Sequence, residues 1–221
     1  MFAPHPDDET LGCGGTIAKK TSEGYRVIVV ILTDGRHAFS KVLGITSNPT
    51  PEELKQIRKS EAKKAIKMLG VSEESIIFLE FEDGKLEKHR EKAKERVLEI
   101  VKRYSPIEIY LPSSKDYNTD HKITNQIVKQ CIKESKSSPK IFQYSIMQKY
   151  AKVGPLIDKL ANIIKRHIVE VDVSNFTTLK MKAIEQYKSQ TSMISEKQTK
   201  PILNQERIKN YLANKELFYI K

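Results

Sequence analysis

One imidazole and three carboxylates fall within five consecutive residues near the start of the chain, in the stretch Ala-Pro-His-Pro-Asp-Asp-Glu at residues 3–9. Ionised carboxylates this close repel one another, so the group is stable only if it binds a cation or if some of its pKa values rise. The two prolines that flank the histidine restrict the backbone on both sides and hold the side chains in a stiff turn. We therefore expect this turn to bind a divalent metal.

A simpler interpretation is that the carboxylates cap a helix that begins near Thr10. Capping needs one carboxylate rather than three, and it gives no reason for a histidine held between two prolines. The metal interpretation accounts for both features of the stretch.

Strand-like and helix-like segments alternate along the chain, which is typical of an α/β fold with right-handed parallel crossovers. Residues 26–33 form a continuous β-branched run, as expected for a strand covered on both faces. Further strands are expected at 75–81, 107–111, 140–147, 167–173 and 216–220, and helices at 10–23, 51–69, 87–104, 121–134, after Ser174 and at 204–213. Only Met1, Phe2 and Ala3 are available for a strand before Pro4, so the first strand is either short or truncated. We predict one Rossmann-like domain over residues 1–221, with a mostly parallel sheet, helices on both faces and the metal site at the carboxyl ends of the strands.

Two loops that follow predicted strands contain further candidate site residues. His37 follows the strand at 26–33, and Asp120 and His121 follow the strand at 107–111. Because ligands bind at the carboxyl ends of parallel strands, both loops should lie near the acidic stretch. A lone loop histidine is more often exposed or structural, and the pairing with the acidic stretch favours His121.

The stretch at residues 3–9, followed by Leu11-Gly12 and Gly14-Gly15, resembles the signature of the PIG-L/LmbE-like zinc-dependent N-deacetylases, which remove acetyl from N-acetylglucosamine-type substrates. The resemblance implies one zinc ion per chain. A hydrolytic zinc site takes three protein ligands and leaves a position open, and His5, Asp8 and His121 supply that set. Asp7 is the general base by the same resemblance, and its neighbour Asp8 projects to the opposite side of an extended turn.

Similarity to this family continues along much of the chain. Arg58 and Glu61 lie one turn apart on the helix at 51–69, where they could form an ordinary surface ion pair. The block Arg58-x-x-Glu61 is also similar to one in which the family's arginine reaches the sugar, so we assign Arg58, together with His37, to substrate binding. Asp83-Gly84, Asp172, Lys182-Ala183, Tyr187-x-Ser189-Gln190 and Glu216-Leu217-Phe218 resemble later family blocks.

The chain departs from the family at residues 118–121, which read Asn-Thr-Asp-His where many relatives have His-x-Asp-His. An amide can donate a hydrogen bond to an oxyanion but cannot deliver a proton. We place Asn118 and Asp120 with Asp7 in the catalytic set. The groups that could protonate the leaving amine are then Asp7, Tyr117, His37 and solvent.

The net charge of +11 could indicate an anionic partner. The basic residues are mostly lysines interleaved with Glu, without a basic motif rich in aromatic residues, so no nucleic acid is expected. No apolar run approaches the roughly 20 residues that span a bilayer, and no secretion signal is visible, so we expect a cytoplasmic protein acting on a small molecule or glycoconjugate. Cys13 and Cys131 are expected to be packing residues. The sequence leaves open whether the chain forms a homo-oligomer.

Two other classes of function remain open. A phosphoesterase on the same kind of sheet is favoured if an extra carboxylate or His37 holds a second metal. A non-catalytic basic binding module with a vestigial zinc site is suggested by Asn118 and the positive charge.

Overall fold

The computed structural model describes residues 1–146 and 167–220. The strands of these residues form two sheets. The first sheet has the order β1 (Phe2–Ala3), β2 (Val29–Thr33), β3 (Ile76–Phe81), and the second has the order β4 (Glu108–Pro112), β5 (Lys140–Tyr144), β7 (Lys215–Ile220), β6 (Ile168–Asp172). The β1–β2, β2–β3 and β4–β5 pairs are parallel, and β7 runs antiparallel to both neighbours. A mostly parallel α/β fold is therefore confirmed.

The two sheets meet where β1 lies beside β4. β1 has only two residues, and in the described part of the chain no strand pairing joins it to β4. Tyr144 of β5 donates from its hydroxyl to the carbonyl oxygen of Phe2 at 3.0 Å. The expected short first strand is present, and its shortness divides what would otherwise be one sheet.

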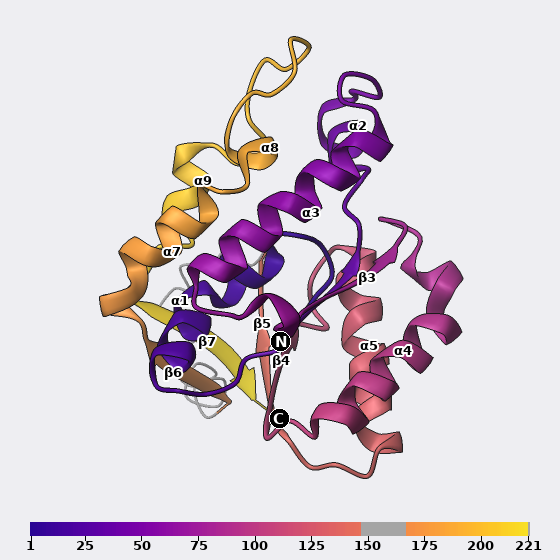
Figure 1. The fold of residues 1–221 in the computed structure, drawn as a ribbon, viewed down its shortest axis with the longest axis vertical. Coiled ribbons are helices and arrows are strands. Elements are labelled where there is room, and N and C mark those ends of the chain that lie inside the picture. The colour runs from indigo at the N-terminus through magenta and orange to yellow at the C-terminus, as the bar shows by residue number, and fades with distance from the viewer. Residues whose placement is uncertain (147–166, 221) are drawn as a thin grey trace, which may run out of the picture.

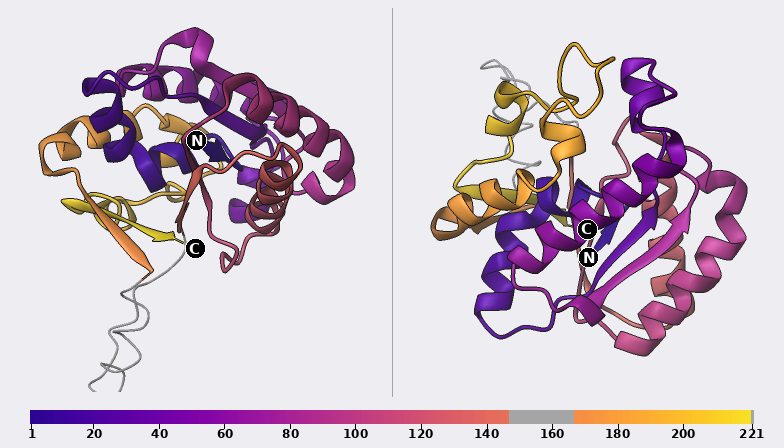
Figure 2. Two further views of the ribbon diagram at one scale, coloured as in Figure 1. Left: turned by 90° about the horizontal axis from the view of Figure 1, so that it is seen from below. Right: turned by 45° about the horizontal axis from the view of Figure 1, so that its top comes forward.

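Helices cover both faces of the strands (Figures 1 and 2). Helices α4 and α5 lie to the right of the strands in Figure 1, while α1, α3 and α7 lie on the other side. The helices are α1 (Asp8–Ser22), α2 (Ala38–Leu43), α3 (Pro51–Met68), α4 (Arg90–Tyr104), α5 (Thr119–Glu134), α7 (Thr177–Ile184), α8 (Lys188–Thr191) and α9 (Gln205–Lys209), with 3₁₀ turns at Glu73–Ser75, Leu86–His89 and Ser174–Phe176.

Alternate residues of β2 enter two different apolar clusters, as expected for a strand that is covered on both faces. Val29 and Ile31 pack with α1, α3 and α7, whereas Val30 and Leu32 pack with α4 and α5. Each cluster contains residues of both sheets, so the two sheets share their cores. The two thiols are buried, Cys13 in the first cluster and Cys131 in the second, which confirms them as packing residues.

The glycines at the start of α1 allow close packing. A Cβ atom at Gly12 would collide with the ring of Tyr144, and one at Gly15 would lie 2.7 Å from Val173 Cβ. With larger residues at these two positions, α1 could not pack this closely against Tyr144 and Val173.

Most predicted elements are present with shifted ends. The helix α3 begins with the expected capping box, in which Thr50 and Glu53 bond each other reciprocally. The loop expected after β2 contains the short helix α2, which was not predicted. The strand expected at 140–147 ends at Tyr144. Met147, the last residue of the expected strand, lies outside the described residues, as does the Lys-rich stretch that follows it up to Arg166.

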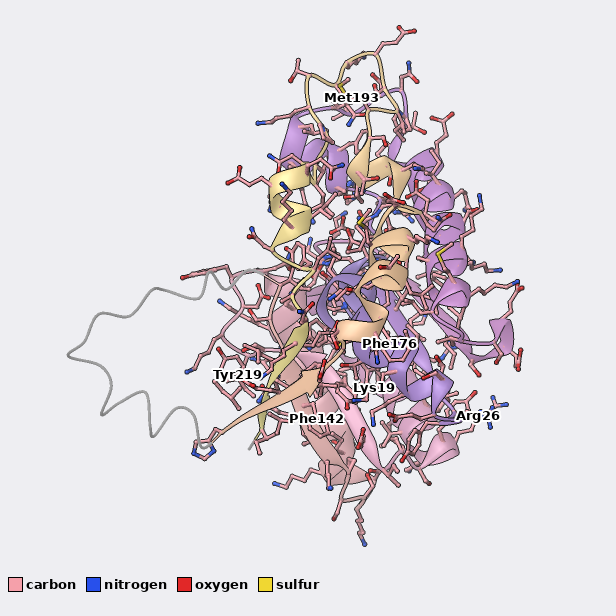
Figure 3. All side chains as sticks on the ribbon, turned by 90° about the vertical axis from the view of Figure 1, so that its left-hand side faces the viewer. Lys19, Arg26, Phe142, Phe176, Met193 and Tyr219 are labelled. Atoms are coloured by element: carbon pink, nitrogen blue, oxygen red, sulfur yellow. The ribbon has the colours of Figure 1, made fainter. Side chains whose placement is uncertain are left out.

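The segment between α8 and α9 extends away from the sheets (Figure 1). Figure 3 shows Met193 at the far end of this segment, while Phe142 and Phe176 lie beside the strands and helices of the core. Met193 is 61% exposed, whereas Phe142 is buried. None of the described helices is both long enough and apolar enough to cross a bilayer.

Candidate metal centre

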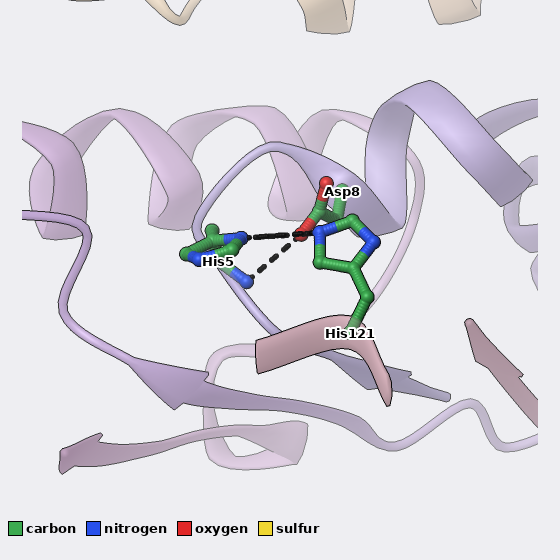
Figure 4. Close-up of side chains that lie close together, drawn as sticks. All are labelled: His5, Asp8 and His121. Carbon is green, nitrogen blue, oxygen red and sulfur yellow. Dashed lines mark hydrogen bonds and ion pairs between the residues drawn. The ribbon is translucent and has the colours of Figure 1, made fainter. Parts of the chain in front are cut away.

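His5, Asp8 and His121 converge on one point (Figure 4). His5 lies in the turn that follows β1, Asp8 is the first residue of α1, and His121 is in the first turn of α5. The distances are 3.0 Å from His5 Nδ1 to Asp8 Oδ2, 3.1 Å from Asp8 Oδ2 to His121 Nε2, and 3.3 Å between His121 Nε2 and His5 Nδ1. All three side chains are buried at the carboxyl ends of the parallel strands.

This triangle has the size and chemistry of a zinc site. Zinc bonds of about 2.0–2.1 Å in tetrahedral geometry separate neighbouring ligand atoms by roughly 3.3 Å. Two imidazole nitrogens and one carboxylate oxygen also form a donor set that hydrolytic zinc sites use. Burial lowers the pKa of His121, but Asp8 and Asp116 outweigh it and raise this pKa to about 9. The surroundings therefore favour a cation at this point.

In both histidines, the ring nitrogen that is not part of the ligand triangle contacts an aspartate. His121 Nδ1 lies 3.0 Å from Asp116 Oδ2. His5 Nε2 lies 3.3 Å from Asp120 Oδ2 and 3.5 Å from Asp83 Oδ1. Such partners fix the orientation of metal-binding imidazoles and raise their basicity. Asp120 thus contacts the outer ring nitrogen of His5, a candidate metal ligand.

His5, Asp83 and Asp120 form a second group with potential ligand atoms close together. Its two carboxylates already accept other hydrogen bonds. Lys41 Nζ lies 2.6 Å from Asp83 Oδ1, and the backbone N–H groups of Gly84 and Leu86 donate to Asp120 at 2.6 and 3.3 Å. These contacts favour a role for Asp83 and Asp120 in orienting His5 rather than in binding the metal themselves.

The contacts of Asp83 and Asp116 with the histidines were not predicted from the sequence. From the sequence, Asp83 was named only within a block that resembles the family, and Asp116 was not named. A usable signal existed for Asp116, because it follows β4 and precedes His121 by five residues in the same loop. Asp83 gave a similar signal, because it stands just after β3.

Asp7 lies next to the three ligands but has different partners. Its carboxylate Oδ2 is 3.0 Å from Arg58 Nη2. Burial, together with the charges of Asp8 and Glu9, raises the pKa of Asp7 to about 7 against the opposing effect of Arg58. Asp7 also has φ +130° and ψ −27°, a conformation that non-glycine residues rarely adopt.

Arg58 is buried beside Asp7. Its guanidinium donates to the carbonyl oxygens of Pro6 and Gly35 as well as pairing with Asp7. Glu61 accepts instead from the backbone N–H and the hydroxyl of Ser189, at 2.7 and 2.6 Å. The interpretation of Arg58 and Glu61 as a surface ion pair is therefore wrong.

The structure does not bring His37 or Asn118 into contact with the three ligands. His37 is at the start of α2, with Nε2 2.9 Å from Glu82 Oε1. Asn118 is exposed and caps α5, its Oδ1 accepting from the backbone N–H of Asp120 at 2.8 Å. Within residues 1–146 and 167–220, neither side chain has a hydrogen bond or ion pair to His5, Asp8 or His121.

Comparison with known proteins gives one family match and several relatives. A family model described as PIG-L, GlcNAc-PI de-N-acetylase, matches residues 1–132. Diacetylchitobiose deacetylase of Thermococcus kodakarensis is 36% identical over 110 residues, which cover 49% of this chain and 38% of the relative. The 4-oxalmesaconate hydratase of Pseudomonas putida is 28% identical over 131 residues, which cover 59% of this chain and 49% of the relative. The matches thus span less than half the length of these two curated relatives.

Solved structures share the fold across nearly the whole chain. N,N'-diacetylchitobiose deacetylase from Pyrococcus horikoshii has a TM-score of 0.72 at 23% identity, with 100% of this chain and 82% of that chain covered. The 4-carboxy-2-hydroxymuconate hydratase GalB from Pseudomonas putida has a TM-score of 0.66 at 21% identity, with 96% and 80% covered. At these identities the likeness is one of fold.

Proposed function

Because the chain belongs to the PIG-L family of GlcNAc-PI de-N-acetylase-like proteins, we propose that it is a zinc-dependent hydrolase that removes the N-acetyl group from an N-acetylglucosamine-type sugar or glycoconjugate. The observation that carries this proposal is the buried triangle of His5, Asp8 and His121 with a second carboxylate, Asp7, beside it. The curated relative named as a diacetylchitobiose deacetylase supports the same class of substrate.

His5, Asp8 and His121 would hold one zinc ion per chain. When bound, zinc lowers the pKa of water and polarises a carbonyl group. Asp116 and Asp120 accept from the outer nitrogens of the two imidazoles, which presents the inner nitrogens, His5 Nδ1 and His121 Nε2, as ligands.

Asp7 acts as the general base in this proposal. Its carboxylate is excluded from the ligand triangle by its contact with Arg58, so it remains free to take a proton from the attacking water. A base works best when its pKa lies near the working pH, and burial moves the pKa of Asp7 in that direction. The same carboxyl group, once protonated, can return the proton to the leaving amine.

Arg58 and Asn118 have roles that follow from their contacts. Arg58 spans Asp7 and the carbonyl oxygens of Pro6 and Gly35, so it fixes the base and presents positive charge at the edge of the substrate site. Asn118 uses Oδ1 to cap α5, which leaves its Nδ2 group to donate to the oxyanion. His37, held by Glu82, is a candidate contact for an outer part of the substrate.

Hydration of a carbon–carbon double bond is a second candidate function. The observation that favours it is the match to the hydratase of Pseudomonas putida, which covers more of this chain than the deacetylase match does. Both reactions need an activated water, so the same base and ligands could serve either one. Substrate shape and charge would then decide between them.

The deciding experiment is a screen for acetate release with zinc-loaded protein and N-acetylglucosamine, its oligomers, glycosides and lipid conjugates. The Asp7→Asn variant is the matched control, since it removes the base and keeps the shape of the side chain. Acetate release that Asp7→Asn abolishes supports the proposal. Loss of absorbance from unsaturated dicarboxylic acids without acetate release would favour the hydratase.

Metal analysis of the same sample tests the remaining alternatives. One zinc per chain agrees with the deacetylase. Two metals per chain with phosphate release would favour a phosphoesterase that uses Asp83 and Asp120 as additional ligands. Salt-dependent binding of nucleic acid without turnover would favour a binding module.

A further inference from the structure

The backbone of Asp7 needs an external restraint. Its φ of +130° lies in a region that costs a non-glycine residue of the order of 1–3 kcal/mol and persists only where the surroundings enforce it. The residue sits between the turn that provides His5 and the first turn of α1 that provides Asp8. If the Asp7 backbone relaxed to a more common conformation, the Asp7 carboxylate would move relative to His5 and Asp8.

Glu9 provides this restraint. Its side chain is fully buried, and its Oε2 accepts from the backbone N–H of Asp7 at 3.1 Å. Its Oε1 accepts from the hydroxyl of Thr10 at 2.6 Å and from the hydroxyl of Tyr187. With both oxygens bonded, the carboxylate cannot turn away from Asp7.

Tyr187 is the distant member of this group. It lies between α7 and α8, 178 residues from Glu9 in the sequence, and its ring is fully buried against α1 and α3. The same segment is fastened a second time through Ser189, which donates two hydrogen bonds to Glu61 of α3. The position of the Tyr187 hydroxyl is therefore fixed by packing in the core, although Tyr187 lies in a connection between two helices.

We propose that Tyr187 is a positioning residue of the active centre, which acts through Glu9 to hold the Asp7 backbone in its positive-φ conformation. The proposal rests on the proposed function in taking Asp7 as the base. Tyr187 itself lacks a contact with the three candidate ligands in the part of the chain that the structure describes. Its contribution is to the placement of Asp7 and therefore to turnover, with substrate binding and metal content left intact.

The first test compares Tyr187→Phe with Tyr110→Phe. Both tyrosines are buried in the same apolar cluster, and both donate to a glutamate, Tyr110 to Glu108 at 3.0 Å. Glu108 pairs with Lys20 and not with the Asp7 turn. We expect Tyr187→Phe to lower kcat by about tenfold to a hundredfold with KM within about twofold and zinc content unchanged, because small misplacements of a catalytic group cost rates of this size. Tyr110→Phe should keep kcat within about twofold, and equal kcat values in the two variants would overturn the proposal.

The second test needs no substrate, so it separates failure of this proposal from failure of the deacetylase function. Hydrogen exchange of the Asp7 amide, followed by NMR, should be at least tenfold faster in Tyr187→Phe than in Tyr110→Phe, because only the former loosens the acceptor Glu9. Equal protection in the two variants would overturn the proposal even if both are inactive.

Variants of Glu9 test the same path from its other end, and the single Glu9 variants do not depend on how Tyr187→Phe folds. Glu9→Gln keeps an oxygen for the Asp7 N–H, and its amide can donate to the tyrosine hydroxyl, so it should retain more Asp7 protection than Glu9→Ala. Adding Tyr187→Phe to Glu9→Ala should then cost no further activity, since the path through Glu9 is already lost. A further loss equal to that of Tyr187→Phe alone would contradict the path.

Discussion

Arg58 Nη2 lies 3.0 Å from Asp7 Oδ2, and this contact draws Asp7 away from the metal triangle that its neighbour Asp8 helps to form. Two adjacent, chemically identical carboxylates therefore have different surroundings. Asp8 faces two histidines, while Asp7 faces a guanidinium and the backbone. The assignment of one as ligand and the other as base depends on this difference.

Replacing the candidate ligands should remove the metal without a matching effect at Asp7. We expect Asp8→Ala and His121→Ala to lower the zinc content well below one per chain, because each removes one of three protein ligands. Asp7→Ala should keep the metal and lose turnover. Elemental analysis of dialysed protein measures this, and full zinc in both ligand variants would contradict the assignment.

Arg58→Lys should lower kcat/KM by about tenfold to a hundredfold without loss of zinc. A lysine ammonium cannot reproduce the forked donors that reach Asp7 and two carbonyl oxygens together. Lys59→Arg, at the next position of α3, is the control and should leave kcat/KM unchanged. An unchanged kcat/KM in Arg58→Lys would mean that the base keeps its place without this guanidinium.

Asp120→Asn should weaken zinc binding by about tenfold to a hundredfold, because it replaces the charged acceptor behind His5 with an amide. Competition with a chelator gives the dissociation constant. Asp172→Asn makes the same chemical change at an exposed site and should leave the zinc affinity unchanged. Equal affinities in the two variants would show that His5 does not need Asp120.

Asn118 can be tested for its two uses separately. Asn118→Ala should lower stability by about 1 kcal/mol, since it removes the cap of α5, whereas Asn118→Ser keeps a good capping residue. Both variants lack the amide donor, so both should lower kcat by up to about 10²-fold to 10³-fold. Full activity of the stable Asn118→Ser protein would remove Asn118 from the catalytic set.

The buried ion pair of Lys180 and Glu216 should matter for stability. The two charged groups lie 2.7 Å apart in the core, and Glu216 also accepts from the backbone N–H groups of Gly15 and Thr16. Lys180→Ala leaves this carboxylate without its counter-charge and should cost about 3–5 kcal/mol. Lys182→Ala, at an exposed position of α7, should change stability by less than about 0.5 kcal/mol in urea denaturation.

The sequence predicted the strands and long helices well because their signals are local. The β-branched run became β2, and the Thr50–Glu53 box began α3. The antiparallel place of β7 between β5 and β6 was not predictable, because nothing in a short apolar segment states which strands it will pair with. That the whole of residues 1–221 acts as one domain stays a prediction.

The candidate site was predictable where the chain concentrates reactive residues and not where it brings distant ones together. His5, Asp8 and His121 could be named from two loops that follow strands. Arg58 was named as a candidate site residue from similarity to the family, but its contact with Asp7 depends on how α3 crosses the sheet. Lys182 was singled out from similarity, whereas it is exposed and Lys180 is the buried lysine of that helix.

Glu9 and Glu61 belong to the stretch that matches the family, but their partners Tyr187 and Ser189 lie more than fifty residues beyond its end at residue 132. A polypeptide cut at that boundary would contain every candidate metal ligand and the base. It would also lack β5, β6 and β7, leave Glu61 without the two donors of Ser189, and remove the Tyr187 hydroxyl from Glu9. The stretch that matches the family model is therefore shorter than the stretch that supplies the hydrogen-bond partners of these two buried acids.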